Sequence, residues 1–234
     1  MTRLGSLIFC TTLGLSAALL GCSSSSSGGG SGGSIAGGTG GGGAGGSSSG
    51  ASSALDVVVQ SSKIPGWTVD PNNSVTANQV AATATTEKGT EDLVDGAAAD
   101  FFAPPYTPTL FAWQNYVNPS VTNAPNGATV TLYVFQMPSA DQASGLYASL
   151  LSASLYKRKV GTPDDWVDPT SPLVGTDSRI QDTGDHWWIN FYKGNYYVEV
   201  SLGPSAGPAP DFTPGNAATK AAAFAFAQAV AGTI

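Results

Sequence analysis

The feature that most limits how this chain can fold is a long stretch of serine, glycine and alanine near the N-terminus. In residues 23–53 almost every position is one of these three, apart from Ile35 and Thr39. Such a segment has no apolar surface to bury, so nothing offsets the conformational entropy that ordering it would cost. It predicts a flexible tether with a mean end-to-end reach of ~30 Å. We therefore expect a single folded domain over residues 55–234.

The first 21 residues form a different segment. A basic residue, Arg3, precedes an apolar but interrupted stretch at residues 4–20. This order is typical of a secretory signal peptide, and the stretch is too interrupted for a membrane-spanning helix, which needs about 20 apolar residues. The stretch ends in Leu19-Leu20-Gly21-Cys22, which resembles the lipobox of bacterial lipoproteins. That resemblance implies cleavage before Cys22 and a diacylglyceryl group on its thiol.

Residues 22–54 are therefore predicted to be a lipidated cysteine and its tether, with the membrane as a partner through the lipid anchor. Stable anchoring takes more than one lipid chain, as the multiply acylated cysteine of bacterial lipoproteins provides. The residue after Cys22 is Ser23 rather than Asp, which resembles an outer-membrane address in the sorting rule for Gram-negative lipoproteins. We expect the cell envelope, at the outer membrane. The alternative is an ordinary secretory signal with an incidental cysteine.

Charge and cysteine content exclude several classes of protein. Of nine Lys and Arg, Arg3 leaves with the signal, so eight face 16 Asp and Glu, a net charge of −8. Basic residues cluster in Lys157-Arg158-Lys159, and we expect no nucleic-acid partner. Cys10 lies in the signal and Cys22 at the anchor, so the domain can form no disulfide, thiolate zinc site or cysteine nucleophile.

Three helices are predicted from apolar periodicity and capping residues. Thr90 is the expected N-cap of the first, and Ser139 and Gln142 form a capping box for the second. Asn216 is expected to cap the third, and Gly232 to end it. The expected ranges are about 91–102, 140–156 and 217–231.

Strands are predicted from alternating or two-sided apolar runs. The run at 128–137 is apolar on both sides, as a central strand covered on both faces would be. Lys193-Gly194-Asn195 indicates a tight hairpin, and short turns imply antiparallel pairing. The expected ranges are about 109–117, 128–137, 179–181, 187–192 and 196–202. The predicted fold is α+β, with one antiparallel sheet of about five to six strands and three helices packed on it.

Four segments follow one another in a characteristic series. EDLVDGAAADFF (91–102) precedes QMPSADQASGLYASL (136–150), then GDHWWINFYKGNYYVEVSL (184–202) and an alanine-rich terminal helix. The series resembles a family of bacterial exported proteins that carry a domain of unknown function, over most of residues 64–234. That family has no assigned activity, so the resemblance implies no functional residue.

A glycine inside the first predicted helix is a candidate site. Gly96 costs about 1 kcal/mol relative to Ala in a helix interior, so a compensating reason is expected. One reason is the close approach of a ligand or partner, with Asp95 and Asp100 presented beside it. The other is tight packing of the helix against the sheet, which we favour.

Aromatic residues of the hairpin are a second candidate. Trp188, Tyr192 and Tyr197 fall on the same side of the predicted sheet, because side chains alternate along a strand. If that side is exposed, they could bind a sugar ring, a peptide or another protein. If a helix covers it, they are core, which we favour.

Catalytic and metal-binding patterns are weak. His186 is the one histidine, and no serine nucleophile motif accompanies it. Asp164 and Asp165, or Asp182 and Asp185, could supply paired carboxylates or a calcium site, although Asp beside Pro and Gly is usual in turns. We predict no catalytic residue, no metal ligand and no cofactor.

Three functions remain open at this stage. The leading hypothesis is an envelope lipoprotein whose domain binds a partner protein or small envelope component without catalysis. The second is a hydrolase that uses the paired carboxylates or a metal. The third is a module that binds sugars or peptidoglycan through the aromatic hairpin.

Overall fold

The computed structural model describes residues 50–71, 82–94, 98–121, 127–153, 156, 159, 161–162, 164–205 and 217–234. In these residues seven strands form one sheet, accompanied by five helices. The helices are α1 (Ala54–Ser61), α2 (Glu87–Val94), α3 (Ala98–Phe101), α4 (Ala140–Leu150) and α5 (Ala217–Thr233). The strands are β1 (Thr68–Val69), β2 (Ala82–Ala84), β3 (Leu110–Asn118), β4 (Ala128–Gln136), β5 (Asp177–Asp182), β6 (Trp187–Lys193) and β7 (Tyr196–Pro204).

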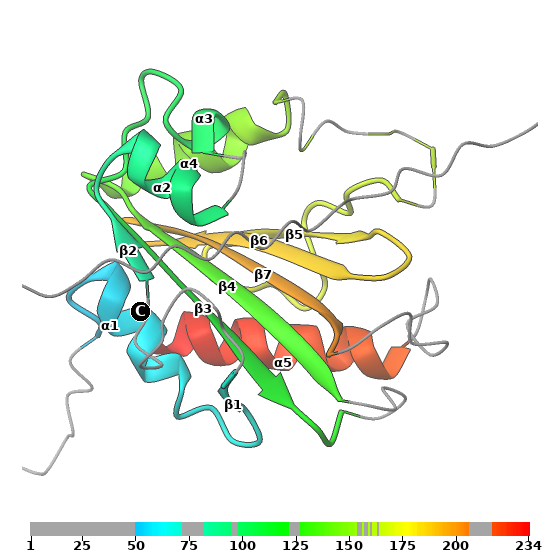
Figure 1. Cartoon of the computed structure of the whole chain (residues 1–234). Coiled ribbons are helices and arrows are strands. Elements are labelled where there is room, and N and C mark those ends of the chain that lie inside the picture. Colours follow the sequence, from blue (N-terminus) through cyan, green and yellow to red (C-terminus); the bar gives the residue numbers. More distant parts are fainter. Residues whose placement is uncertain are drawn as a thin grey trace, which may run out of the picture. The chain divides into compact units, whose positions relative to one another are not determined.

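The sheet runs in the order β1-β3-β4-β7-β6-β5, and β2 also pairs with β3. Every pairing is antiparallel. In Figure 1, α1 and α5 lie along one face of the sheet, whereas α2, α3 and α4 lie over the other. Helices therefore cover both faces, which confirms the predicted α+β class and the single antiparallel sheet.

One hydrophobic core lies between the sheet and the two helices α1 and α5. Ala54, Val57, Val58 and Ser61 of α1 are buried at helical spacing, which turns one side of this helix toward the sheet. Ser53 begins the helix by accepting a hydrogen bond from the Asp56 backbone N–H at 3.1 Å. The core also contains Tyr116, Val130, Leu132, Val134, Val198, Val200, Leu202, Phe226, Ala227 and Val230.

A second core lies under α4 and is rich in aromatic rings. Phe101 of α3 stacks on Phe135 of β4, with ring centres 4.3 Å apart. Leu146 and Leu150 of α4 are also fully buried against it. The alternating residues of β4 divide between the two cores, so the prediction of a central strand covered on both faces is confirmed.

The first predicted helix has a different start. Its capping residue is Thr86 rather than Thr90, because the Thr86 side chain accepts the Gly89 N–H at 3.0 Å and α2 begins at Glu87. Thr90 lies inside the helix and is fully buried. Two threonines one turn apart offer the same capping chemistry, and the prediction chose the wrong one.

The other two predicted helices are confirmed with different ends. α4 has the predicted cap at Ser139 but ends at Leu150, well before residue 156. α5 continues through Gly232 to Thr233. Gly194 connects β6 to β7 with a positive φ of 53°, as the hairpin prediction requires. In the described part of the chain, no helix is long and apolar enough to cross a bilayer.

The predicted element counts are wrong. Helix α1 was not predicted, because its capping serine ends a serine-rich segment and its first turn looks like the tether. The short strands β1 and β2 were also missed, since each consists of two or three residues that pair with β3. Such short runs carry too little periodicity to be recognised.

We predict that Ser139→Ala destabilises the domain by about 1 kcal/mol, because α4 loses the side chain that accepts the Gln142 N–H at 3.2 Å. Urea unfolding measures the change. Ser144→Ala, a substitution inside the same helix, is the matched control and should be neutral or slightly stabilising. An equal loss in both variants would contradict the capping role.

Candidate functional site

The register of the sheet brings three polar side chains into one row beneath α4. Arg179 of β5 pairs with Asn190 of β6, and Asn190 pairs with Glu199 of β7. Paired residues of adjacent strands project from the same face. All three are at most 1 % exposed. Buried charged residues of this kind are rare unless they have partners. These three residues, called the polar row, are the candidate site.

Glu199 lies at the end of this row and accepts three hydrogen bonds. Tyr156 donates to its Oε2 at 2.9 Å, Tyr197 donates to its Oε1 at 2.5 Å, and Asn190 donates to the same oxygen at 3.2 Å. Burial raises the pKa of Glu199 to about 7, although these tyrosines and Arg179 act in the opposite direction. The carboxyl group therefore changes its charge near neutral pH.

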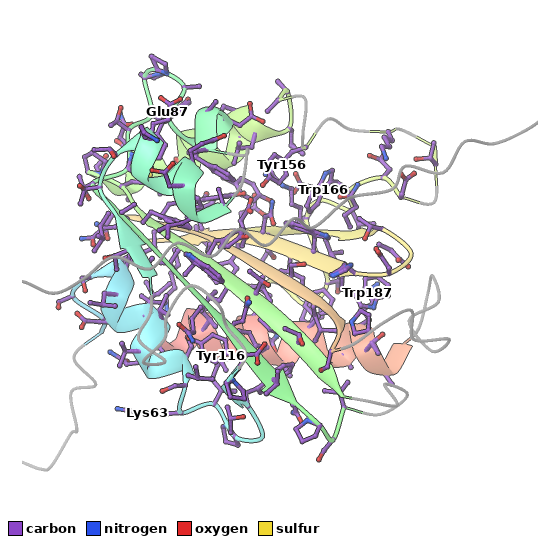
Figure 2. All side chains as sticks on the ribbon, in the orientation of Figure 1. Lys63, Glu87, Tyr116, Tyr156, Trp166 and Trp187 are labelled. Atoms are coloured by element: carbon purple, nitrogen blue, oxygen red, sulfur yellow. The ribbon has the colours of Figure 1, made fainter. Side chains whose placement is uncertain are left out.

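Arg179 is held mainly by aromatic rings. Its guanidinium carbon lies 4.4 Å from the ring centre of Tyr147 and 5.2 Å from that of Trp166, at cation–π distances. Its Nη1 donates to the Tyr147 carbonyl at 2.7 Å. Figure 2 shows Trp166 and Tyr156 on the α4 side of the sheet, whereas Tyr116 lies on the opposite side. The charge of Arg179 is thus stabilised within the second core.

The polar row is closed to solvent. Glu199, Arg179 and Tyr156 are 1 %, 0 % and 3 % exposed, respectively. A general acid or base must reach its substrate within hydrogen-bonding distance, and these groups face one another instead. The row can nevertheless fix strand register, because a slip of one residue would place a carboxylate or guanidinium in the other, apolar core.

We predict that Glu199→Gln makes the domain less sensitive to pH. The folded pKa of about 7 exceeds the ordinary value of 4.5. The stabilising contribution of Glu199 is therefore fully present below pH 4.5 and is lost as the pH rises through 7. The free energy of unfolding of the variant minus that of the parent should therefore rise by roughly 3 kcal/mol between pH 4 and pH 8.

Urea titrations at several pH values test this expectation. The exposed Glu87→Gln is the control, and its difference from the parent should stay nearly constant across the range. A constant difference for Glu199→Gln as well would show that the carboxyl is not buried as described.

Tyr156→Phe should raise the pH at which the domain loses the stabilising contribution of Glu199; we call this loss the Glu199 transition. The variant loses the hydrogen bond to Oε2 that favours the ionised carboxyl, so the pKa of Glu199 rises further. Tyr116→Phe is the matched control, because that hydroxyl donates to the Val58 carbonyl at 2.6 Å in the other core. The control should lose stability without moving the transition. An unmoved transition in Tyr156→Phe would argue against the hydrogen bond.

The predicted aromatic surface is largely packed. Tyr197 is fully buried, and Trp188 and Tyr192 are half-buried against the second core. Tyr192 lies beside Tyr147 of α4, with ring centres 5.3 Å apart. Tyr197 therefore belongs to the core, as the favoured interpretation expects, and it is not part of an exposed candidate surface, because α4 covers this part of the sheet.

Of the remaining predicted site residues, the structure describes Asp100 alone. Cys22, Asp95 and Gly96 lie outside the described residues. Asp100 is half-buried in α3 and lines a pocket of about 270 Å³ together with Tyr106. The structure thus places Asp100 at a small surface pocket.

The other acidic residues form local turn contacts. Asp164 pairs with Lys159 and accepts a hydrogen bond from Thr162 at 2.7 Å. Asp185 Oδ1 lies 3.0 Å from His186 Nδ1. Burial alone would raise the pKa of Asp185, but hydrogen bonds from His186 and other neighbours lower it. Within the described ranges, no three His, Cys, Asp or Glu residues gather closely enough to hold a metal ion.

A surface groove runs between α5 and the segment 171–175, and we call it the α5 groove. Its wider end has a volume of about 410 Å³ and is lined by Pro172, Lys220, Ala221, Phe224, Ala225 and Gln228. Its narrower end has a volume of about 220 Å³ and is lined by Leu173, Gly175, Lys193, Gln228, Ala231 and Gly232. Gln228 lines both, so the two pockets lie next to each other along α5.

Sequence reasoning missed both the polar row and the α5 groove. Glu199, a charged residue among the mostly apolar residues 196–202, was a usable signal for the row. The groove had no such signal, because its walls are separated by more than 40 residues.

Comparisons with known proteins give no further guide to the site. No protein-family model matches the chain, and searches of curated proteins and of solved structures find no match. The resemblance to exported bacterial proteins stays a prediction.

Proposed function

We propose that this chain is a lipoprotein of the bacterial cell envelope, anchored through Cys22 at the outer membrane, whose domain binds a ligand or partner without catalysis. The lipobox-like residues before Cys22 and the serine- and glycine-rich segment after it support the anchor. A tether with a reach of ~30 Å lets the domain sample the space near the membrane. Binding is the activity that such an arrangement serves most directly.

The observation that carries the binding role is the contrast between the polar row and the α5 groove. The strongly shifted carboxyl, Glu199, is sealed in the core, where it can contact no substrate. The α5 groove is open and combines apolar side chains with the cations Lys193 and Lys220. Apolar linings with a few polar groups are typical of ligand sites. The groove is therefore the proposed binding surface.

The tether joins the domain close to one end of this groove. The Ala51 backbone N–H donates to the Thr233 carbonyl at 2.9 Å, and Tyr196 donates to the Ala51 carbonyl at 3.1 Å. Thr233 ends α5, directly after the groove residues Ala231 and Gly232.

We predict that Cys22→Ser abolishes lipid attachment. In a Gram-negative host grown with labelled palmitate, the parent should carry the label and separate with outer-membrane vesicles on a density gradient. The variant should lose the label, because a serine hydroxyl cannot replace the thiol in the lipid transfer.

Cys10→Ser is the matched control, since Cys10 lies in the predicted signal and should not be labelled in the mature chain. An unlabelled parent chain would refute the anchor, and a label that persists in Cys22→Ser would place it on another residue.

A further inference from the structure

We infer that the surface pocket at Asp100 binds a primary ammonium group carried on a short aliphatic chain. This pocket, which we call the Asp100 pocket, has a volume of about 270 Å³. It is additional to the α5 groove, because α3 and α4 lie over the opposite face of the sheet (Figure 1). Its lining includes Asp100, Pro104 and Tyr106 from α3 and the loop that follows, and Ser149, Ser152 and Ala153 from the end of α4 and the turn after it.

The two walls of the Asp100 pocket are held in place by packing. Phe101, the neighbour of Asp100 in α3, stacks on Phe135 of the sheet with ring centres 4.3 Å apart. Tyr106 lies directly against Gly145 of α4, where a Cβ atom would come within 2.5 Å of the Tyr106 Cε1. Glycine inside a helix costs about 1 kcal/mol relative to alanine, and this close contact is a structural reason for it. Walls that are already ordered reduce the entropy lost when a ligand binds.

Asp100 gives the pocket a negative charge that has no partner. Its carboxylate is half-buried, and among the residues that the structure describes it makes neither a hydrogen bond nor an ion pair. Most of the other described aspartates do contact a donor. Asp92, for example, pairs with Lys88 at 2.9 Å. None of the residues that line the Asp100 pocket is basic, so its carboxylate is available to a cation from outside the chain.

The end of α4 adds to this negative potential. The C-terminal end of a helix carries a partial negative charge, because the peptide dipoles of the helix are aligned. α4 ends at Leu150, which also lines the pocket, and its last turn contains no basic residue. The carboxylate and the helix end together select for a positively charged ligand group.

The polar groups of the pocket match the three donors of a primary ammonium group. Besides the Asp100 carboxylate, the lining includes the hydroxyl groups of Tyr106 and Ser152, whose oxygens can accept hydrogen bonds. Pro104 and Ala153 offer apolar contacts for methylene groups. An alkylamine and the side chain of a lysine both combine these features.

Other cations agree less well with the same observations. A calcium ion takes six to eight oxygen ligands, and no three His, Cys, Asp or Glu residues gather around a common point within the described ranges. A quaternary ammonium group is typically bound by several aromatic rings, whereas Tyr106 is the one aromatic residue among those that line the pocket. The volume of about 270 Å³ lies at the small end of ligand sites, which favours a short chain.

Titration with pentylammonium tests the inference on the chain from residue 22 onward, with Cys22→Ala to prevent acylation. Removal of residues 1–21 leaves every described residue in place. In two-dimensional NMR spectra, the backbone amides of residues 100–106 and 149–153 should shift and reach saturation. Pentanol, which has the same chain without the charge, should bind roughly tenfold more weakly or less, because it forms no charge-assisted hydrogen bond with Asp100.

Three variants locate the site. Asp100→Asn should weaken pentylammonium binding roughly tenfold or more, since the ion pair is lost. Asp141→Asn is the matched control, because it makes the same change of charge in the first turn of α4 and should leave the affinity unchanged. Ser152→Lys, at an exposed position, places a competing ammonium group beside Asp100 and should block binding. Circular dichroism verifies that each variant is folded.

A second ligand distinguishes the two sources of the ammonium group. Nα-acetyl-lysine methylamide presents it as the side chain of a lysine within a protein. Tighter binding of this compound than of pentylammonium would identify the ligand as a lysine of a partner protein or peptide. Weaker binding would identify it as a free amine, and the ammonium site is supported in both cases.

Several results would overturn the inference. These are the absence of saturable shifts, equal affinity for pentanol, or unchanged affinity in both Asp100→Asn and Ser152→Lys. Calcium binding at the same amides without a response to pentylammonium would assign the pocket to a metal ion instead. The palmitate experiment on Cys22 is independent of these measurements, so failure of the ammonium site and failure of the membrane anchor can be told apart.

Discussion

The buried row of Arg179, Asn190 and Glu199, in which Asn190 donates a hydrogen bond to Glu199, is the interaction on which the rest of this fold depends. It crosses three adjacent strands, and its members are all buried. Such groups are stable in a core only when their partners lie at the correct register. The aromatic residues beneath α4 supply these partners, which ties the position of the helical cover to the pairing of the strands.

In this arrangement the carboxyl group with a strongly raised pKa is buried, whereas the surface open to a ligand lies elsewhere. Glu199, whose pKa burial raises to about 7, faces the interior, and the tyrosines beside it do the same. The surface offers instead the α5 groove, which combines apolar side chains with Lys193 and Lys220. This division supports a binding role. Asp164, Asp165, Asp182 and Asp185 make local turn contacts instead.

The parts of the fold that could be predicted are those with local signals. The two-sided apolar run of β4, the cap at Ser139 and the glycine turn after Lys193 each depend on neighbouring residues alone. Helix α1 could not be predicted, because Ser53 resembles the serines of the tether that precede it. The sequence also could not decide whether Tyr197 is exposed or buried, since alternation shows which residues share a face but not which face α4 covers. The polar row needs the register of two successive hairpins, and the groove needs the packing of α5 against a distant segment.

The most direct test of this account is the pKa of Glu199, measured from the carbon-13 shift of its side-chain carboxyl during a pH titration. Selective labelling and comparison with Glu199→Gln identify the resonance. The account predicts a midpoint near pH 7, set by burial within the polar row. A midpoint near the ordinary value of 4.5 would mean that water reaches this carboxyl. The separation of a sealed core from an open binding surface would then be contradicted.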